Sequence, residues 1–171
     1  MSMDSERIGI MFYHYIEKGG CFMEKSVSEK NKRVILVSGM SGAGKSVATR
    51  SLEDMGYHVI DNFPVQLVSL LVDMIETSID PRYSYIALST SAQDFPAFLR
   101  LLKGQNFEVQ VLFLDANDSV LLHRYKSTRR THPLLLSNTC NTLDEAISVE
   151  RQMFSRNLNN SFINLRKTYL L

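Results

Sequence analysis

The sequence predicts an α/β fold in which helices cover both faces of a central parallel sheet. Apolar runs of strand length alternate with helix-compatible segments through the middle of the chain. The run at 111–114, Val-Leu-Phe-Leu, is apolar without interruption, which is typical of a strand buried on both faces. A glycine-rich loop also joins the first apolar run to the first helical segment. These observations predict βαβ units, with any ligand site at the carboxyl ends of the strands.

The glycine-rich loop carries the strongest functional signal in the chain. It follows the apolar run at 33–38 and consists of Gly39, Met40, Ser41, Gly42, Ala43, Gly44, Lys45 and Ser46. The spacing G-x-x-x-x-G-K-S is that of a phosphate-binding P-loop, so the fold class narrows to a three-layer, kinase-like P-loop NTPase fold. We expect the loop amides to hold phosphate oxygens, Lys45 to reach the outer phosphates and Ser46 to ligate Mg²⁺. The expected cofactor is ATP or GTP with Mg²⁺.

The first half of the chain is expected to contain two strands and two helices in alternation. A strand at 33–38 leads into the loop, and a helix at 47–55 has its apolar residues on one face. Gly56 suits the C′ position that ends this helix. A short strand at 57–60 follows, and Pro64 fits the first turn of the next helix.

The second half continues the alternation. The expected elements are, in order, a strand at 83–88, a helix at 96–104, a strand at 107–115, a helix at 118–130, a helix from 142 to about 157 and a fifth strand at 161–165. Pro96 opens the first of these helices, and His132-Pro133 breaks the second. A capping box from Thr142 to Glu145 opens the third.

The composition indicates an ordinary globular chain. Its 171 residues suit one domain with a sizeable core, and its net charge of +1 gives no polybasic surface for nucleic acid or membrane. Cys21 and Cys140 have no metal-ligand spacing, which favours free thiols in a reducing cytoplasm. No apolar run is long enough to cross a bilayer. A cytoplasmic location without a membrane partner is therefore expected.

The domain organisation is expected to comprise three segments. Residues 33–156 form the nucleotide-binding domain, residues 1–32 read as an appendage, and residues 157–171 resemble a truncated, atypical tail. Lys18-Gly19-Gly20 can be encoded by purine-rich codons that resemble a ribosome-binding site, and Met23 follows at a suitable distance. One hypothesis is that translation starts at Met23, and the alternative is a genuine N-terminal arm.

Two carboxylates at the ends of predicted strands are candidate site residues. Asp61 is expected at the tip of the strand beside the P-loop strand. There it either holds a Mg²⁺-bound water or a substrate hydroxyl, or caps the following helix. Asp115 ends a later strand, and capping or turn formation is the favoured interpretation.

Cationic residues cluster after the fourth predicted strand. Arg129 and Arg130 lie at a helix end near the carboxyl side of the sheet, where they would either close over the phosphates or contact a partner, or remain solvated. Arg124 alone is read as part of a solvated helix face. His132 is read as a structural histidine before a proline, with no paired carboxylate identifiable nearby.

The ordered set of motifs resembles the RapZ family of bacterial nucleotide-binding proteins, known as RNase adapter proteins. The motifs cover about residues 33 to 152 and lie at 39–46, 52–57, 61–64, 113–116, 124–125, 128–134 and 150–151. The resemblance implies a cytoplasmic bacterial protein that binds ATP or GTP and hydrolyses it slowly. It also implies a second, C-terminal domain that carries RNA binding and amino-sugar sensing.

Two departures from the family limit what the resemblance implies. The family's third strand usually ends in an Asp-hydrophobic-Arg motif, whereas residues 88–92 here read Leu-Ser-Thr-Ser-Ala. The chain also stops where the second domain is expected, so RNA binding is not expected of it.

Three functional hypotheses follow. The first is slow hydrolysis of a nucleoside triphosphate, with Lys45 and Arg129 stabilising the phosphates. The second is a small-molecule kinase in which Asp61 activates the acceptor hydroxyl. The third is a non-catalytic remnant that binds nucleotide, or nothing, and acts through protein contacts, as a homo-oligomer or with another protein. Loss of nucleotide affinity and hydrolysis on replacing Lys45 by Ala would separate the enzymes from the remnant.

Overall fold

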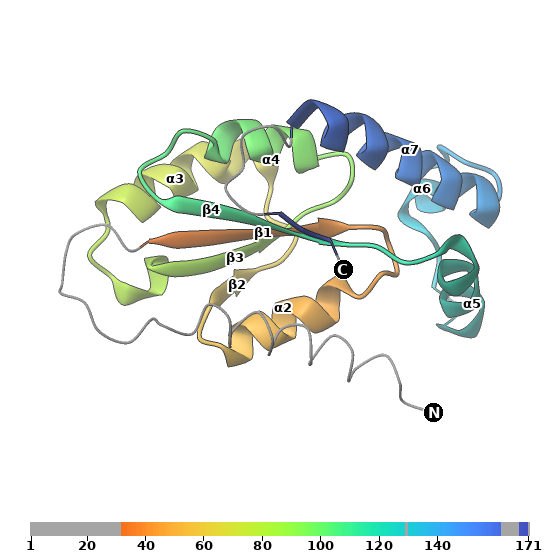
Figure 1. The fold of residues 1–171 in the computed structure, drawn as a ribbon, viewed down its shortest axis with the longest axis horizontal. Helices are drawn as coiled ribbons and strands as arrows, with labels where there is room; N and C mark the ends of the chain where they lie inside the picture. The colour runs from red at the N-terminus through yellow and green to blue at the C-terminus, as the bar shows by residue number, and fades with distance from the viewer. Residues whose placement is uncertain (1–31, 129, 162–167, 171) are drawn as a thin grey trace. The chain divides into compact units, whose positions relative to one another are not determined.

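The described residues form an α/β unit around a five-stranded parallel sheet. The computed structural model describes residues 32–128, 130–161 and 168–170, all of which belong to one compact unit spanning residues 31–171 (Figure 1). The strand order is β2-β3-β1-β4-β5, and every pairing is parallel. The strands are β1 (Arg33–Gly39), β2 (His58–Ile60), β3 (Tyr85–Ser89), β4 (Glu108–Leu114) and β5 (Thr168–Leu170). The predicted fold class is confirmed.

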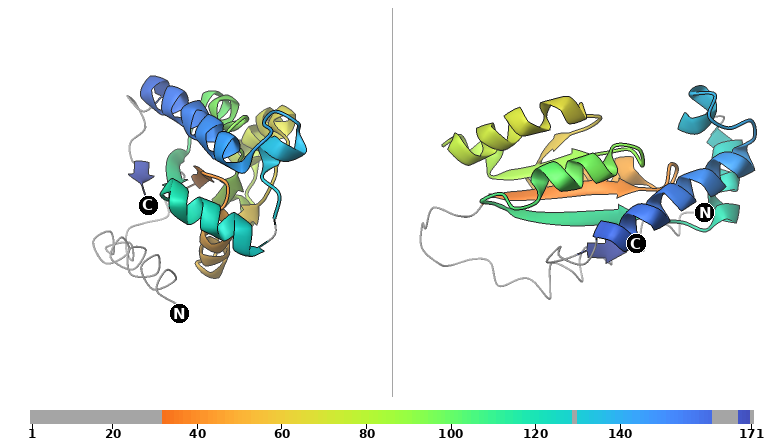
Figure 2. Two further views of the ribbon diagram at one scale, coloured as in Figure 1. Left: turned by 90° about the vertical axis from the view of Figure 1, so that its right-hand side faces the viewer. Right: turned by 90° about the horizontal axis from the view of Figure 1, so that it is seen from above.

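Helices cover both faces of this sheet. They are α2 (Lys45–Asp54), α3 (Val68–Thr77), α4 (Phe95–Leu102), α5 (Asp118–Thr128), α6 (Pro133–Leu136) and α7 (Leu143–Ser161), with 3₁₀ turns η1 (Val65–Leu67) and η2 (Pro81–Tyr83). Helix α2 lies on one face, whereas α3, α4 and α7 lie on the other (Figures 1 and 2). Within the described residues, no helix has both the length and the apolarity needed to span a bilayer.

Two sequence predictions about elements are wrong, and a third falls mostly outside the described residues. Of the predicted fifth strand at 161–165 the structure describes only Ser161, which ends α7, and the described strand β5 lies at Thr168–Leu170. Pro64 does not open an α-helix, since η1 intervenes before α3. The residues after His132 form the unpredicted helix α6, because Pro133 suits the first helical position and the His132 side chain caps the helix.

Two predicted helix boundaries, the end of α2 and the start of α7, are confirmed. Gly56 follows α2 with a φ of 88°, the left-handed conformation expected at C′. At the start of α7, the Glu145 amide donates to Thr142 Oγ1 at 3.2 Å. The Glu145 carboxylate accepts from the Asn141 amide at 2.9 Å, one residue before the position that a capping box requires.

An aromatic cluster fixes α7 against the sheet. Phe113 of β4 and Phe154 of α7 have ring centroids 4.8 Å apart, and Phe95 of α4 lies 5.9 Å from Phe154. The Phe95 and Phe154 side chains are fully buried. This packing matters for the site because α7 runs from the cluster towards the loop that follows β1 (Figure 1).

Candidate functional site

The loop at residues 39–46 connects β1 to α2 at the carboxyl edge of the sheet. Its first residue is pressed against β4, because Gly39 pairs with Leu114 in the sheet register. A Cβ atom on Gly39 would lie 2.0 Å from the Leu114 carbonyl oxygen, and the φ of Gly39 is 134°. The Met40 amide donates to the same oxygen at 2.9 Å. Only glycine fits this position, so close packing against β4 explains why the first residue of the motif is a glycine.

Helix α2 begins without a side-chain cap. Gly44 occupies the N-cap position with a φ of 111°, and no side chain accepts from the first turn. Among the described residues, no acceptor is found for the backbone amides of Gly42, Gly44, Lys45 and Ser46. These amides lie together at the positive end of the helix dipole, an arrangement that suits an anion.

The Lys45 side chain folds back over the loop. Its ammonium donates to the carbonyl oxygens of Gly39 at 2.6 Å and Met40 at 3.2 Å. Burial lowers the pKa of Lys45, while the negative charges of Glu150 and Asp61 oppose that change. The cation is therefore held beside the uncapped amides by two neutral acceptors, which a charged phosphate oxygen could replace.

Glu150 on α7 binds the loop directly and was missed by the sequence analysis as a site residue. Its carboxylate accepts from the Ser41 amide at 2.9 Å and from the Ser41 hydroxyl at 2.7 Å. Glu150 is 4% exposed and lies on the buried stripe of α7 with Ala146 and Phe154. In the sequence, Glu150 stands at helical spacing between the apolar residues Ala146 and Phe154. This spacing is the signal that could have indicated a buried carboxylate with a hydrogen-bond partner.

His132 is the second partner of Glu150. Its Nδ1 accepts from the Leu134 amide at 3.2 Å, so Nε2 carries the proton and donates to Glu150 Oε2 at 3.2 Å. The expectation that His132 lacks a paired carboxylate is therefore wrong. Burial acts to raise the pKa of Glu150, yet the hydrogen bonds from His132 and Ser41 and the charge of Lys45 hold that pKa below its usual value.

Helix α5 contributes two side chains over the loop. A Cβ atom on Gly42 would lie 3.1 Å from Tyr125 Cε2, so the Tyr125 ring packs on this glycine. Burial raises the pKa of Tyr125 to about 12, which keeps its hydroxyl protonated. Arg124 Nη1 donates to the Gly42 carbonyl oxygen at 3.1 Å. Arg124 is thus a loop contact, which corrects its interpretation as part of a solvated face.

The other predicted site residues have different positions. Arg129 lies outside the described residues, whereas Arg130 is exposed and its charge acts on Tyr125. Asp61 does follow β2, but β3 separates β2 from the P-loop strand, so the predicted adjacency is wrong. Asp61 is exposed, and its charge nevertheless acts on Lys45.

Asp115 has a structural role in the turn after β4. Both of its carboxylate oxygens accept from Arg151 Nη1 at 3.0 Å, and Oδ1 also accepts from the Ala116 amide at 2.7 Å. Arg151 further donates to Asp118 at the start of α5. This ion-pair network ties α7 to the helix that packs on the loop.

Ser46 fits the predicted Mg²⁺ position. It lies in the first turn of α2, directly after Lys45, and is exposed. Magnesium ions bound with nucleotides take few protein ligands and fill the remaining positions with phosphate oxygens and waters. One hydroxyl beside the uncapped amides of the loop at 39–46 is therefore a suitable protein ligand.

Comparisons with known proteins agree with this fold. The family model described as RapZ-like N-terminal domain matches residues 32–165. A nucleotide-binding protein of Vibrio vulnificus (strain YJ016) is 44% identical over 127 residues, which cover 71% of this chain and 43% of that protein. A nucleotide-binding protein of Hahella chejuensis (strain KCTC 2396) is 42% identical over 132 residues, 71% of this chain and 44% of that protein. The chain thus spans less than half of the length of these curated relatives.

A solved structure supports the fold independently. The YorR protein of Bacillus subtilis, crystallised in complex with phosphorylated GDP, matches with a TM-score of 0.50 and 14% identity. The match covers 81% of this chain and 84% of that one. At this identity the likeness concerns the fold alone, and the unit has a P-loop NTPase fold.

Proposed function

The chain belongs to the RapZ-like N-terminal domain family, and from that premise we propose that it binds a nucleoside triphosphate at residues 39–46 and hydrolyses it slowly with Mg²⁺. The observation that carries the proposal is the group of four amides, at Gly42, Gly44, Lys45 and Ser46, for which the described part of the chain offers no acceptor and which lie beside the Lys45 ammonium. Backbone amides and a lysine converging at one helix N-terminus suit polyphosphate.

The roles in the proposed site follow from position. The amides of Gly42, Gly44, Lys45 and Ser46 hold phosphate oxygens, and the Lys45 ammonium exchanges its carbonyl partners for the outer phosphates. Ser46 ligates Mg²⁺, which neutralises charge on the phosphates when bound. Either ATP or GTP suits this site, because the contacts involve phosphates and not the base.

The hydrogen bonds that Glu150 already accepts favour slow turnover. Glu150 already accepts from Ser41 and His132, so it is not available to orient an attacking water. Arg124 donates to the loop carbonyl of Gly42 and can contribute positive charge near the phosphates. A site that stabilises the charge of the phosphates, but whose buried carboxylate does not serve as general base for the attacking water, favours nucleotide binding over rapid hydrolysis.

Transfer of the terminal phosphoryl group to a small-molecule hydroxyl is a second candidate function. The exposed Asp61 carboxylate is close enough for its charge to act on Lys45, so an acceptor hydroxyl beside Asp61 would lie near the phosphates. In that reaction Asp61 would accept the hydroxyl proton. An ATP turnover that rises with one added metabolite, and loses that rise in Asp61→Asn, would favour this candidate.

A cytoplasmic location remains part of the proposal, whereas RNA binding is not proposed for this chain.

Isothermal titration calorimetry with MgATP and MgGTP tests the proposed binding. Replacing Lys45 by Ala removes a charged hydrogen-bond donor, and we expect affinity about 10- to 100-fold weaker. Lys103→Ala is the matched control, because Lys103 is exposed and lies at the far end of α4. Equal affinities of the Lys45→Ala variant and the parent chain would contradict the proposal.

A further inference from the structure

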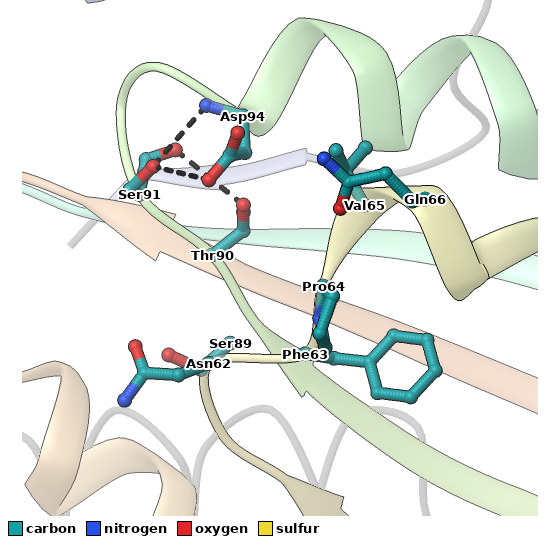
Figure 3. A pocket seen from close by; sticks show the side chains of 9 residues that line it. All are labelled: Asn62, Phe63, Pro64, Val65, Gln66, Ser89, Thr90, Ser91 and Asp94. Carbon is teal, nitrogen blue, oxygen red and sulfur yellow. Dashed lines mark hydrogen bonds between the residues drawn. The ribbon is translucent and has the colours of Figure 1, made fainter.

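A pocket lies at the carboxyl ends of β2 and β3, outside the loop at 39–46. Its volume is about 210 Å³, below the roughly 300 Å³ at which sites for drug-sized ligands begin, and it has room for one small metabolite. The pocket is lined by Asn62, Phe63, Pro64, Val65, Gln66, Ser89, Thr90, Ser91 and Asp94 (Figure 3). The predicted phosphate contacts at residues 39–46 are not among its lining.

One wall of the pocket presents hydroxyl groups and a fixed carboxylate. Ser91 Oγ donates to Asp94 Oδ2 at 3.0 Å and accepts from the Asp94 amide at 3.2 Å (Figure 3). This reciprocal pair orients the Asp94 carboxylate, which has further lone pairs for ligand hydroxyls. The buried Thr90 hydroxyl lines the same region; it donates to the Ser91 carbonyl oxygen at 3.5 Å and can accept from a ligand hydroxyl.

The other side of the pocket comes from the connection between β2 and η1. Phe63, Pro64 and Val65 lie there next to the amide side chains of Asn62 and Gln66. A pocket that combines a few apolar side chains with hydroxyls, amides and a carboxylate suits a molecule that has C–H faces and a rim of hydroxyl groups. The described lining residues include no lysine, arginine or histidine, so among them a phosphate or carboxylate on the ligand would face Asp94 without a compensating positive charge.

We infer that this pocket binds a neutral, hydroxyl-rich small molecule of the sugar or polyol class. The site lies close to the proposed nucleotide site. The Thr90 amide donates to the Val37 carbonyl at 3.0 Å, two residues before Gly39 in β1. Asn62 follows Asp61, whose charge acts on Lys45. The bound molecule thus lies beside the loop at 39–46, and it makes no use of the loop amides that are proposed to hold phosphate.

Saturation-transfer NMR on the full 171-residue chain tests the inference. The probes are D-glucose, D-ribose, myo-inositol and glycerol, each added without nucleotide, with glucose 6-phosphate as the anionic comparison. We expect saturation transfer to at least one neutral probe and weaker transfer to the phosphorylated one. Asp94→Asn should weaken binding of that neutral probe about tenfold, because a charged acceptor is lost. Thr90→Val, which keeps the side-chain shape, should weaken it about threefold.

Asp73→Asn provides the matched control, because Asp73 is an exposed carboxylate on α3 that does not line the pocket. Absence of transfer to all four neutral probes would overturn the inference, provided that circular dichroism shows folded protein. Equal binding by Asp94→Asn, Thr90→Val and the parent chain would overturn it as well. Because the samples contain no nucleotide, failure here leaves triphosphate binding to residues 39–46 to its own calorimetric test.

Discussion

Replacing Glu150 is the perturbation whose consequences the structure specifies most fully. The buried carboxylate accepts three hydrogen bonds, from the Ser41 amide at 2.9 Å, the Ser41 hydroxyl at 2.7 Å and His132 Nε2 at 3.2 Å. Glu150→Ala leaves these donors buried without an acceptor. Removing one partner from a buried charged network costs about 3–5 kcal/mol, and we expect that loss in the free energy of unfolding.

Glu150→Gln separates the charge from the hydrogen bonds. The amide oxygen can still accept from the Ser41 amide and His132, and the Ser41 hydroxyl can turn to accept from the new NH₂ group. The three hydrogen bonds are kept, but each becomes a bond to a neutral amide and is about 1 kcal/mol weaker than the bond to the carboxylate. At the same time, the free-energy cost of burying a charged group disappears. We therefore expect a loss of about 2 kcal/mol, clearly smaller than that of Glu150→Ala.

The pH dependence provides a second readout of Glu150. Because its folded-state pKa is lowered, the unfolded chain binds more protons in the acid range. The contribution of Glu150 to stability is therefore fully present above the unfolded pKa of about 4.3 and is lost as the pH falls through the folded value. Glu150→Gln should reduce the loss of stability between about pH 5 and pH 3.

Urea unfolding monitored by circular dichroism at pH 7 and pH 4 measures these changes. Glu53→Gln is the control, because Glu53 is exposed on α2 and its replacement should change stability by less than about 0.5 kcal/mol. Comparable m values would show that the variants unfold from similarly compact states. A Glu150→Gln variant with the stability and pH dependence of the parent chain would refute the assigned role of the carboxylate.

Three further substitutions test the packing around the loop by the same unfolding assay. Gly39→Ala should cost at least about 3 kcal/mol, because its Cβ would lie 2.0 Å from the Leu114 carbonyl oxygen, and a stability near that of the parent would refute the close approach. Ser38→Ala should raise stability by up to about 1 kcal/mol, because the described residues offer no partner to the buried Ser38 hydroxyl, and a large loss would reveal one. Arg151→Ala should cost about 1–2 kcal/mol, less at high salt, since the Arg151 side chain, 33% exposed, pairs with Asp115 and Asp118; a salt-independent cost would contradict an ionic origin.

Features set by neighbouring residues could be predicted from the sequence. The loop at 39–46 depends on glycines at fixed spacing, and the end of α2 depends on Gly56 alone. The continuous apolar run at 111–114 similarly indicated a strand buried on both faces. Each conclusion rests on a local backbone or burial requirement, and together they predicted the fold class.

Features that depend on how distant segments meet could not be predicted in the same way. Asp61 was expected beside the P-loop strand because it ends the next strand along the chain, but the fold inserts β3 between β2 and β1. Glu150 lies 109 residues from Ser41, and nothing local to either residue indicates the hydrogen bonds between them. Arg124 likewise contacts Gly42 only because α5 packs against the loop.

Backbone amide NMR during titration with Mg²⁺ and a non-hydrolysable ATP analogue tests the central claim most directly. The claim is that the uncapped start of α2 and the Lys45 ammonium together hold a polyphosphate. We predict that the amide resonances of Gly42, Gly44, Lys45 and Ser46 shift most strongly and saturably. Unshifted resonances at these four positions under saturating analogue, or the largest shifts elsewhere in the chain, would contradict the account.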